Sequence, residues 1–174
     1  MNVGARMIQE HGDQWVVYLR NIYRGSRDGY GLNDFFDLVK DHTHIIFFCR
    51  VAGTDHVFGG YNKIGHKNFP KTPGSPMYKD FEDMSAFLFS LNHRTKHVPV
   101  MRKDKCVRHT HLDFLIVMGQ APDIAISANC DEAKQNAKDL KSMSAFGING
   151  GTYKVYDELN TENAPSYFAG ANRF

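Results

Sequence analysis

The stretch A-F-L-F-S-L, residues 86–91, decides the class of fold expected for this chain. Successive side chains of a strand point to opposite faces of a sheet, so Phe87 and Phe89 would share one face. Leu88 and Ser90 would share the other. A strand that is apolar on nearly both faces is typical of the interior of a two-sheet sandwich. We therefore expect Phe87 and Phe89 to lie in the hydrophobic core.

Other short segments have a similar composition: they are rich in β-branched and aromatic residues, and turn residues separate them. They are residues 45–51, 56–63, 111–118 and 123–127, with weaker candidates at 152–156 and 166–170. Several of these strands follow one another without an intervening helix. This arrangement favours an antiparallel sandwich over a parallel sheet with crossover helices.

Helices are expected mainly ahead of these strands. Residues 5–23 carry apolar side chains at mixed helical spacings and predict an amphipathic helix that ends near Asn21. After a glycine-rich turn, the segment L-N-D-F-F-D-L-V-K-D-H predicts a short second helix with Asn33 as its N-cap. A late and mostly polar helix is expected over residues 131–142.

The composition fits one globular domain, because 174 residues with 42% hydrophobic content can bury a sizeable core. A net charge of +2 with scattered basic residues gives no stripe that would track phosphates, so nucleic-acid binding is not expected. No apolar run approaches the about 18 residues of a membrane span, so no membrane insertion is expected. The cysteines are Cys49, Cys106 and Cys130, without a C-x-x-C pair, which favours a reducing, cytoplasmic location.

The spelling H-T-H-L-D at residues 109–113 raises the question of a metal site. In a strand, His109, His111 and Asp113 would line one face about 7 Å apart per step. Two imidazoles and a carboxylate suit a transition metal, and binuclear metallo-hydrolases use H-x-H-x-D-H. Here Phe114 stands where the final histidine would be. We therefore expect no bound metal and interpret the motif as a solvent-facing strand edge, with a metal-dependent enzyme as the alternative.

A reactive cysteine is a second alternative. Cys106 lies between Lys105 and Arg108, whose charges would lower the pKa of its thiol and make it oxidisable. A pairing of cysteine and histidine in space stays open, because the partners of such a pair need not be neighbours in sequence. The sequence motifs of the nucleophile elbow, the P-loop and the dinucleotide-binding fold are all missing. No catalytic residue, cofactor or metal is therefore expected.

Glycines mark two further segments. Gly25 and Gly29 flank Asp28 in R-G-S-R-D-G, and an Asp-Gly pair predicts a tight turn with positive φ at the glycine. We expect Asp28 and Gly29 to be structural and not catalytic. Gly59 and Gly60 fall inside a strand candidate, where they indicate a bulge or a close approach of another part of the chain.

Five segments, taken in order, carry a resemblance to a known family. They are R-G-S-R-D-G (24–29), F-G-G-Y (58–61), A-F-L-F-S-L (86–91), D-I-A-I-S-A-N-C (123–130) and Y-F-A-G-A-N-R-F (167–174). Together they resemble the TLDc domain, the module of the oxidation-resistance proteins and their relatives. The resemblance assigns a structural or interface role to Arg24, Gly25, Ser26, Asp28, Gly29, Phe58, Gly59, Gly60, Tyr61, Phe87, Phe89, Asp123, Asn129, Cys130 and Gly170.

The resemblance implies an α+β fold, namely a two-sheet antiparallel β-sandwich with a few flanking helices. Residues 1–22 would form a helical lead-in and residues 23–174 the TLDc-like domain. The chain stops about where the family continues into one more strand, and a missing strand would leave a sheet edge open to another chain.

The resemblance also implies a non-enzymatic protein-binding module that acts inside a larger assembly in the cytoplasm. Family roles are protection against oxidative stress, binding and regulation of the vacuolar-type proton ATPase, and service as a module of trafficking, cytoskeletal or ciliary proteins. The partners implied are therefore other proteins, with the vacuolar-type ATPase or a cytoskeletal assembly as the named cases.

Overall fold

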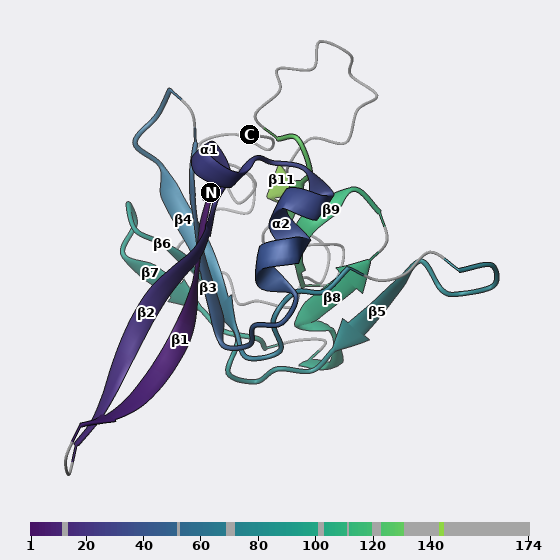
Figure 1. Ribbon diagram of the computed structural model, residues 1–174. Coiled ribbons are helices and arrows are strands. Elements are labelled where there is room, and N and C mark those ends of the chain that lie inside the picture. The colour runs from purple at the N-terminus through teal and green to yellow at the C-terminus, as the bar shows by residue number, and fades with distance from the viewer. Residues whose placement is uncertain are drawn as a thin grey trace.

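A computed structural model describes residues 1–11, 14–51, 53–68, 72–100, 103–110, 112–119, 123–130 and 143–144. Its strands and helices are shown in Figure 1. The strands are β1 (Asn2–His11), β2 (Gln14–Arg24), β3 (Ile45–Arg50), β4 (Val57–Asn62), β5 (Tyr78–Phe81), β6 (Phe87–Ser90), β7 (Thr95–His97), β8 (Val107–Thr110), β9 (Phe114–Met118), β10 (Ile124–Ser127) and β11 (Met143–Ser144). The helices are α1 (Gly25–Asp28), α2 (Leu32–Val39) and the 3-10 turn η1 (Lys103–Lys105).

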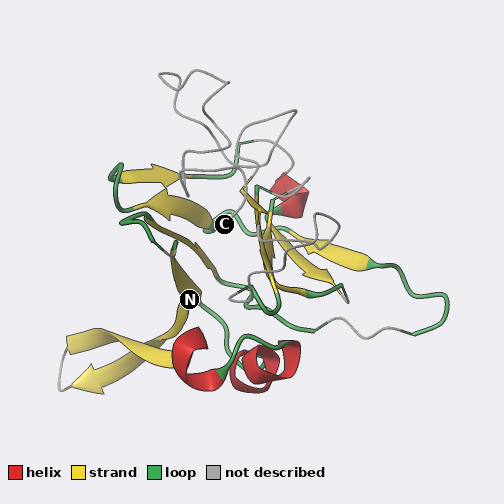
Figure 2. Cartoon of the chain, turned by 90° about the horizontal axis from the view of Figure 1, so that it is seen from above, coloured by secondary structure: helices red, strands yellow, loops and turns green. Residues whose placement is uncertain are grey.

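Two antiparallel sheets make up the described fold. The six-stranded sheet has the order β2-β1-β3-β4-β6-β7, and the five-stranded sheet has the order β11-β10-β9-β8-β5. Figure 2 shows α1 and α2 together on one side of the two sheets. This arrangement confirms the two-sheet antiparallel β-sandwich with flanking helices.

The N-terminal segment corrects one expectation, because residues 5–23 do not form a helix. They belong to a long hairpin in which β1 pairs antiparallel with β2, and β1 also pairs with β3. The two strands are separated by Gly12 and Asp13, a dipeptide typical of two-residue hairpin loops. Val3 and Tyr23 are register partners and both are fully buried, so this hairpin contributes to the core.

The helix α2 connects the two sheets, since it contacts β2 in one and β9 in the other. It begins two residues earlier than expected, with Gly31 and not Asn33 as its N-cap. The Asp34 carboxylate accepts a hydrogen bond of 3.0 Å from the Gly31 N–H, which satisfies a backbone donor at the helix start. The buried face of α2 consists of Phe35, Phe36 and Val39.

The core lies between the inward faces of the sheets and under α2. Its largest fully buried side chains are Tyr23, Phe35, Phe47, Phe58, Ile45, Leu88, Leu115, Ile116 and Met118. They come from both sheets and from α2, and they form one cluster. Burial of this apolar surface stabilises the sandwich at roughly 25 cal/mol per Å².

The other segments predicted from sequence have mixed outcomes. The strands expected at 45–51, 56–63, 85–91 and 123–127 are confirmed as β3, β4, β6 and β10. The single strand expected at 111–118 is wrong in its first part, because β9 begins only at Phe114. The weak strand candidates at 152–156 and 166–170 and the helix expected at 131–142 lie outside the described residues.

Candidate functional site

The segment R-G-S-R-D-G comprises the last residue of β2, the short helix α1 and the glycine that follows it, and Asp28 stabilises it through hydrogen bonds. The Arg24 N–H donates a 2.8 Å hydrogen bond to Asp28 Oδ2. The Arg27 guanidinium donates two more, from Nε to Oδ1 at 2.6 Å and from Nη2 to Oδ2 at 2.7 Å. Because Arg27 and the Arg24 N–H both favour the ionised carboxylate, the pKa of Asp28 falls to about 2. Asp28 therefore works as a fixed anion that closes this turn, and the exposed Ser26 accepts a 3.1 Å hydrogen bond from Arg24 Nε.

Two glycines of the same segment allow its tight course. A Cβ on Gly25 would overlap the ring of Tyr30, so only glycine fits beneath this tyrosine. Gly29 has a φ of +96°, the left-handed conformation indicated by the Asp-Gly pair. The Tyr23 hydroxyl donates a 2.5 Å hydrogen bond to the Gly29 carbonyl, which ties the turn to the buried end of β2.

The segment D-I-A-I-S-A-N-C reaches the same junction from the other sheet. Beyond β10, the Asn129 N–H donates a 2.8 Å hydrogen bond to the Tyr30 carbonyl. Asp123 is fully buried ahead of β10, and Cys130 is partly buried against the core. The hydrogen bond between Asn129 and Tyr30 connects the two sheets through the α1–α2 loop. The described residues of these two segments therefore lie at a junction between the sheets. Gly170 lies outside the described residues.

The glycines of F-G-G-Y make room for aromatic rings on both faces of β4. A Cβ on Gly59 would lie 2.6 Å from Phe89 Cζ, on the face that points away from the core. A Cβ on Gly60 would lie 2.8 Å from Phe47 Cε1 and 2.9 Å from Leu88 Cδ2, on the core side. The close approach expected at these glycines is therefore confirmed, whereas β4 pairs with β3 in regular register and shows no bulge.

Four rings gather on the outward face of the six-stranded sheet, and we call them the outer aromatic cluster: Phe48, Tyr61, Phe87 and Phe89. Ring centroids are 5.3 Å apart for Phe48 and Phe89, 5.3 Å for Tyr61 and Phe87, and 6.2 Å for Phe87 and Phe89. Register explains the grouping, because Gly59 pairs with Phe48 on one side and with Phe89 on the other. The missing side chain lets the rings of β3 and β6 meet above β4.

The outer aromatic cluster corrects the expectation that both phenylalanines lie in the core. The inward residue of β6 is Leu88, which is fully buried in the core cluster. Phe89 is also buried, at 7% exposed, but by its neighbours on the outward face, and Phe87 is only half-buried. Phe87 and Tyr61 thus present aromatic surface that the strands of both sheets leave open. Lys96 of β7 lies above Phe87, with Nζ 4.3 Å from the ring centroid.

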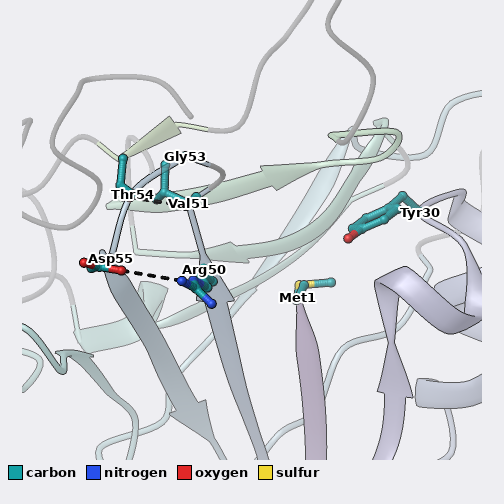
Figure 3. A pocket seen from close by; sticks show the side chains of 7 residues that line it. All are labelled: Met1, Tyr30, Arg50, Val51, Gly53, Thr54 and Asp55. Atoms are coloured by element: carbon teal, nitrogen blue, oxygen red, sulfur yellow. Dashed lines mark hydrogen bonds and ion pairs between the residues drawn. The ribbon is translucent and has the colours of Figure 1, made fainter.

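An open pocket of about 420 Å³ lies beside the β3–β4 loop. Its lining consists of Met1, Tyr30, Arg50, Val51, Gly53, Thr54 and Asp55 (Figure 3). Arg50 and Asp55 approach to 3.5 Å, but their side chains are 71% and 97% exposed, so their pairing is weak. Among the described lining residues there is a guanidinium, a carboxylate, a phenol and a hydroxyl, without a cysteine or histidine. This chemistry suits recognition of a polar group better than covalent catalysis.

The motif H-T-H-L-D does not form one strand face. The strand β8 ends at Thr110, Asp113 lies exposed in the bend before β9, and His111 lies outside the described residues. His109 is 6% exposed and its Nε2 lies 3.2 Å from the Gly65 carbonyl oxygen. The expectation of a solvent-facing edge is therefore wrong for His109. Within the described ranges, three or more potential metal ligands do not come together at any point.

His109 belongs instead to a buried polar cluster that sequence reasoning missed. Its other members are Asn62, Gly65 and His66, from the segment N-K-I-G-H that follows F-G-G-Y. The Asn62 amide nitrogen lies 2.9 Å from His66 Nε2, and the Gly65 N–H donates a 2.6 Å hydrogen bond to Asn62 Oδ1. Burial, with a smaller contribution from the charge of His109, lowers the pKa of His66 to about 3. Burial also lowers the pKa of His109, which favours its neutral imidazole.

Cys106 is not the activated thiol that its neighbours in sequence indicate. It is fully buried, and its Sγ donates to the Lys103 carbonyl at 3.1 Å. Burial raises the pKa of this thiol above its ordinary value. Arg108 points elsewhere, since its Nε donates a 2.6 Å hydrogen bond to Asp80 and its guanidinium stacks 3.8 Å above the ring of Tyr78. Arg108, one of the two cations expected to activate Cys106, is thus paired with Asp80 instead.

Comparisons with known proteins identify one family. The family model described as the TLDc domain matches residues 11–152. No curated protein and no solved structure shows a significant match to this chain. Across the described residues, helices long and apolar enough to span a membrane are absent.

Proposed function

The chain belongs to the TLDc domain family, and from this premise we propose that it is a non-enzymatic protein-binding module of a larger assembly. The observation that carries the proposal is the outer aromatic cluster. The family segments F-G-G-Y and A-F-L-F-S-L supply three of its four rings, Tyr61, Phe87 and Phe89. Half-buried aromatic rings on an outward sheet face are typical of surfaces that another protein covers.

The finer role follows the family. We propose that the module binds a cytoplasmic assembly, either the vacuolar-type proton ATPase or a complex of trafficking, cytoskeletal or ciliary proteins, and that it contributes to oxidative-stress protection through that assembly. The family resemblance supports this choice of partners. The hydrogen bond from the Asn129 N–H to the Tyr30 carbonyl supports it indirectly, because a link between the sheets would help to keep the outer face in one shape for a partner.

The alternative of a redox-active or metal-dependent enzyme receives less support from the side chains. Cys106 is buried with a raised pKa, which disfavours a thiolate nucleophile. His109 directs its Nε2 toward the Gly65 carbonyl, and Asp113 lies in an exposed bend after the end of β8. The His109 imidazole and the Asp113 carboxylate therefore do not face a common cavity.

The proposal is tested by affinity capture with the full chain as bait, followed by mass spectrometry, and by intact-mass analysis after mild peroxide treatment. We expect the same protein partners in replicate captures and an unchanged mass at Cys106. Rapid stoichiometric oxidation of Cys106 together with the lack of any reproducible partner would overturn the binding role and favour the redox alternative.

A further inference from the structure

On strands β3, β4, β6 and β7, the outward face of the six-stranded sheet is aromatic and its charged side chains are cations. Its outward positions on β3, β4, β6 and β7 are Ile46, Phe48, Arg50, Val57, Gly59, Tyr61, Phe87, Phe89 and Lys96. Two of these side chains are cations, and none is a carboxylate. The face therefore combines apolar area with a positive potential, which selects the chemistry of what can cover it.

The two cations lie at opposite sides of the outer aromatic cluster. Lys96 lies beyond β6 on the edge strand β7, and its ammonium group is placed over the ring of Phe87. Arg50 lies on β3 two residues after Phe48, at the point where the outward face reaches the open pocket. Figure 3 shows its guanidinium directed toward Asp55, whose side chain is almost fully exposed. One ligand carboxylate can therefore reach Lys96, and another can reach Arg50, without displacing a buried partner.

We propose that this face docks an extended acidic segment of a partner protein that carries aromatic or aliphatic residues between its aspartates and glutamates. In an extended segment, alternate side chains point the same way, so one set can pack on the outer aromatic cluster. Carboxylates at the two ends of that set can then pair with Lys96 and Arg50. The inference rests on the proposed function, because it names the class of partner that the module would bind.

Single-stranded nucleic acid is the other ligand that prefers aromatic rings beside cations, but the charges here are too few for it. Nucleic-acid grooves follow the backbone with a series of basic residues, whereas the outward positions of β3, β4, β6 and β7 offer Arg50 and Lys96 alone. An acidic peptide needs only a few charge contacts and gains the rest of its affinity from apolar packing.

The test uses the full chain and two labelled ten-residue peptides, one with phenylalanines between glutamates and one with lysines in place of the glutamates. Measured by fluorescence anisotropy, wild-type protein should bind the acidic peptide at least about tenfold more tightly than the lysine peptide. Lys96→Glu should remove about tenfold or more of that affinity, and Phe87→Thr should weaken binding of the acidic peptide too. Thermal melts confirm that each variant is folded.

Lys79→Glu is the matched control, because Lys79 makes the same kind of cation–π contact with Phe81 in the other sheet, at 5.2 Å. It should leave the affinity for the acidic peptide unchanged. Equal losses for both lysine variants would show a general charge effect and overturn the inference. It would also fail if the wild type bound neither peptide or preferred a labelled single-stranded oligonucleotide. Self-association that Phe87→Thr abolishes would identify a second copy as the occupant and overturn it as well.

Failure of the inference and failure of the proposed function are distinguishable. If a reproducible protein partner is captured equally well by wild type and by Lys96→Glu, the docking face is wrong and the binding role stands. If the wild type captures no partner in any extract, the binding role itself fails.

Discussion

Gly59 should be the least replaceable glycine of β4. In Gly59→Ala, the new methyl group would meet the Phe47 carbonyl oxygen, which belongs to the paired strand, and Phe89 Cζ at 2.6 Å. Backbone in the middle of a sheet cannot move aside without breaking ladder hydrogen bonds. In Gly60→Ala, the methyl group would meet only side-chain atoms, of Phe47 at 2.8 Å and of Leu88 at 2.9 Å, and side chains can rotate.

The magnitude follows from these contacts. Forcing a methyl group into a packed site costs typically about 1–3 kcal/mol, and the loss of unfolded-state entropy on replacing glycine by alanine offsets about 0.4–1 kcal/mol. We expect Gly60→Ala to lose about 1 kcal/mol and Gly59→Ala about 2 kcal/mol, which corresponds to a fall in Tm of roughly 4–8 °C for Gly59→Ala. Urea unfolding followed by circular dichroism measures both. A Gly59→Ala protein within about 0.5 kcal/mol of wild type, or less destabilised than Gly60→Ala, would refute the reasoning.

Three further predictions concern the core, the buried histidines and the junction. Leu88→Ala should cost about 2–5 kcal/mol in urea unfolding, whereas Phe87→Ala on the outward face should cost only about 1–2 kcal/mol; equal costs would contradict the assignment of faces. The pKa values of His66 and His109 are lowered in the folded state, so the unfolded chain binds more protons below its own pKa of about 6.5. Stability should therefore be complete above that pH and fall as pH drops from about 6.5 toward 3, and a flat urea midpoint across this window would count against the buried cluster. Asp28 contributes stability above its unfolded pKa of about 3.9 that is lost as pH falls toward 2, so Asp28→Asn should lower Tm at pH 7 but much less at pH 2, which calorimetry can check.

The central strands were predictable because their sequences are rich in β-branched and aromatic residues, which suit the partly buried surface of a sheet. The segment I-I-F-F-C-R alternates between buried and partly exposed side chains in β3, as a strand between core and surface must. The hairpin of β1 and β2 was misjudged for a physical reason. Its apolar residues fall at mixed spacings, which we interpreted as helical, and the pairing of β1 with β2 and with β3 cannot be seen in the spacing within one segment.

The candidate site was less predictable, since it depends on contacts across strands. Alternation places Phe87 and Phe89 on one face correctly, but which face points inward is set by Gly60, whose missing side chain admits Phe47 and Leu88 on the core side. The effect of neighbouring charge on the Cys106 thiol was misjudged for a similar reason. Sequence shows Arg108 two residues away, and only the pairing of β5 with β8 brings Asp80 to hold it.

Site-specific crosslinking in cells tests directly whether the outward face of the six-stranded sheet binds another protein. Phe87, on the outward face of the six-stranded sheet, is replaced in the full chain by the photoreactive amino acid benzoylphenylalanine, and Tyr78, an exposed ring on the other sheet, serves as the matched position. We expect a discrete crosslinked protein partner from position 87 that Lys96→Glu diminishes and that position 78 does not give. A partner crosslinked from position 78 and not from position 87 would contradict it.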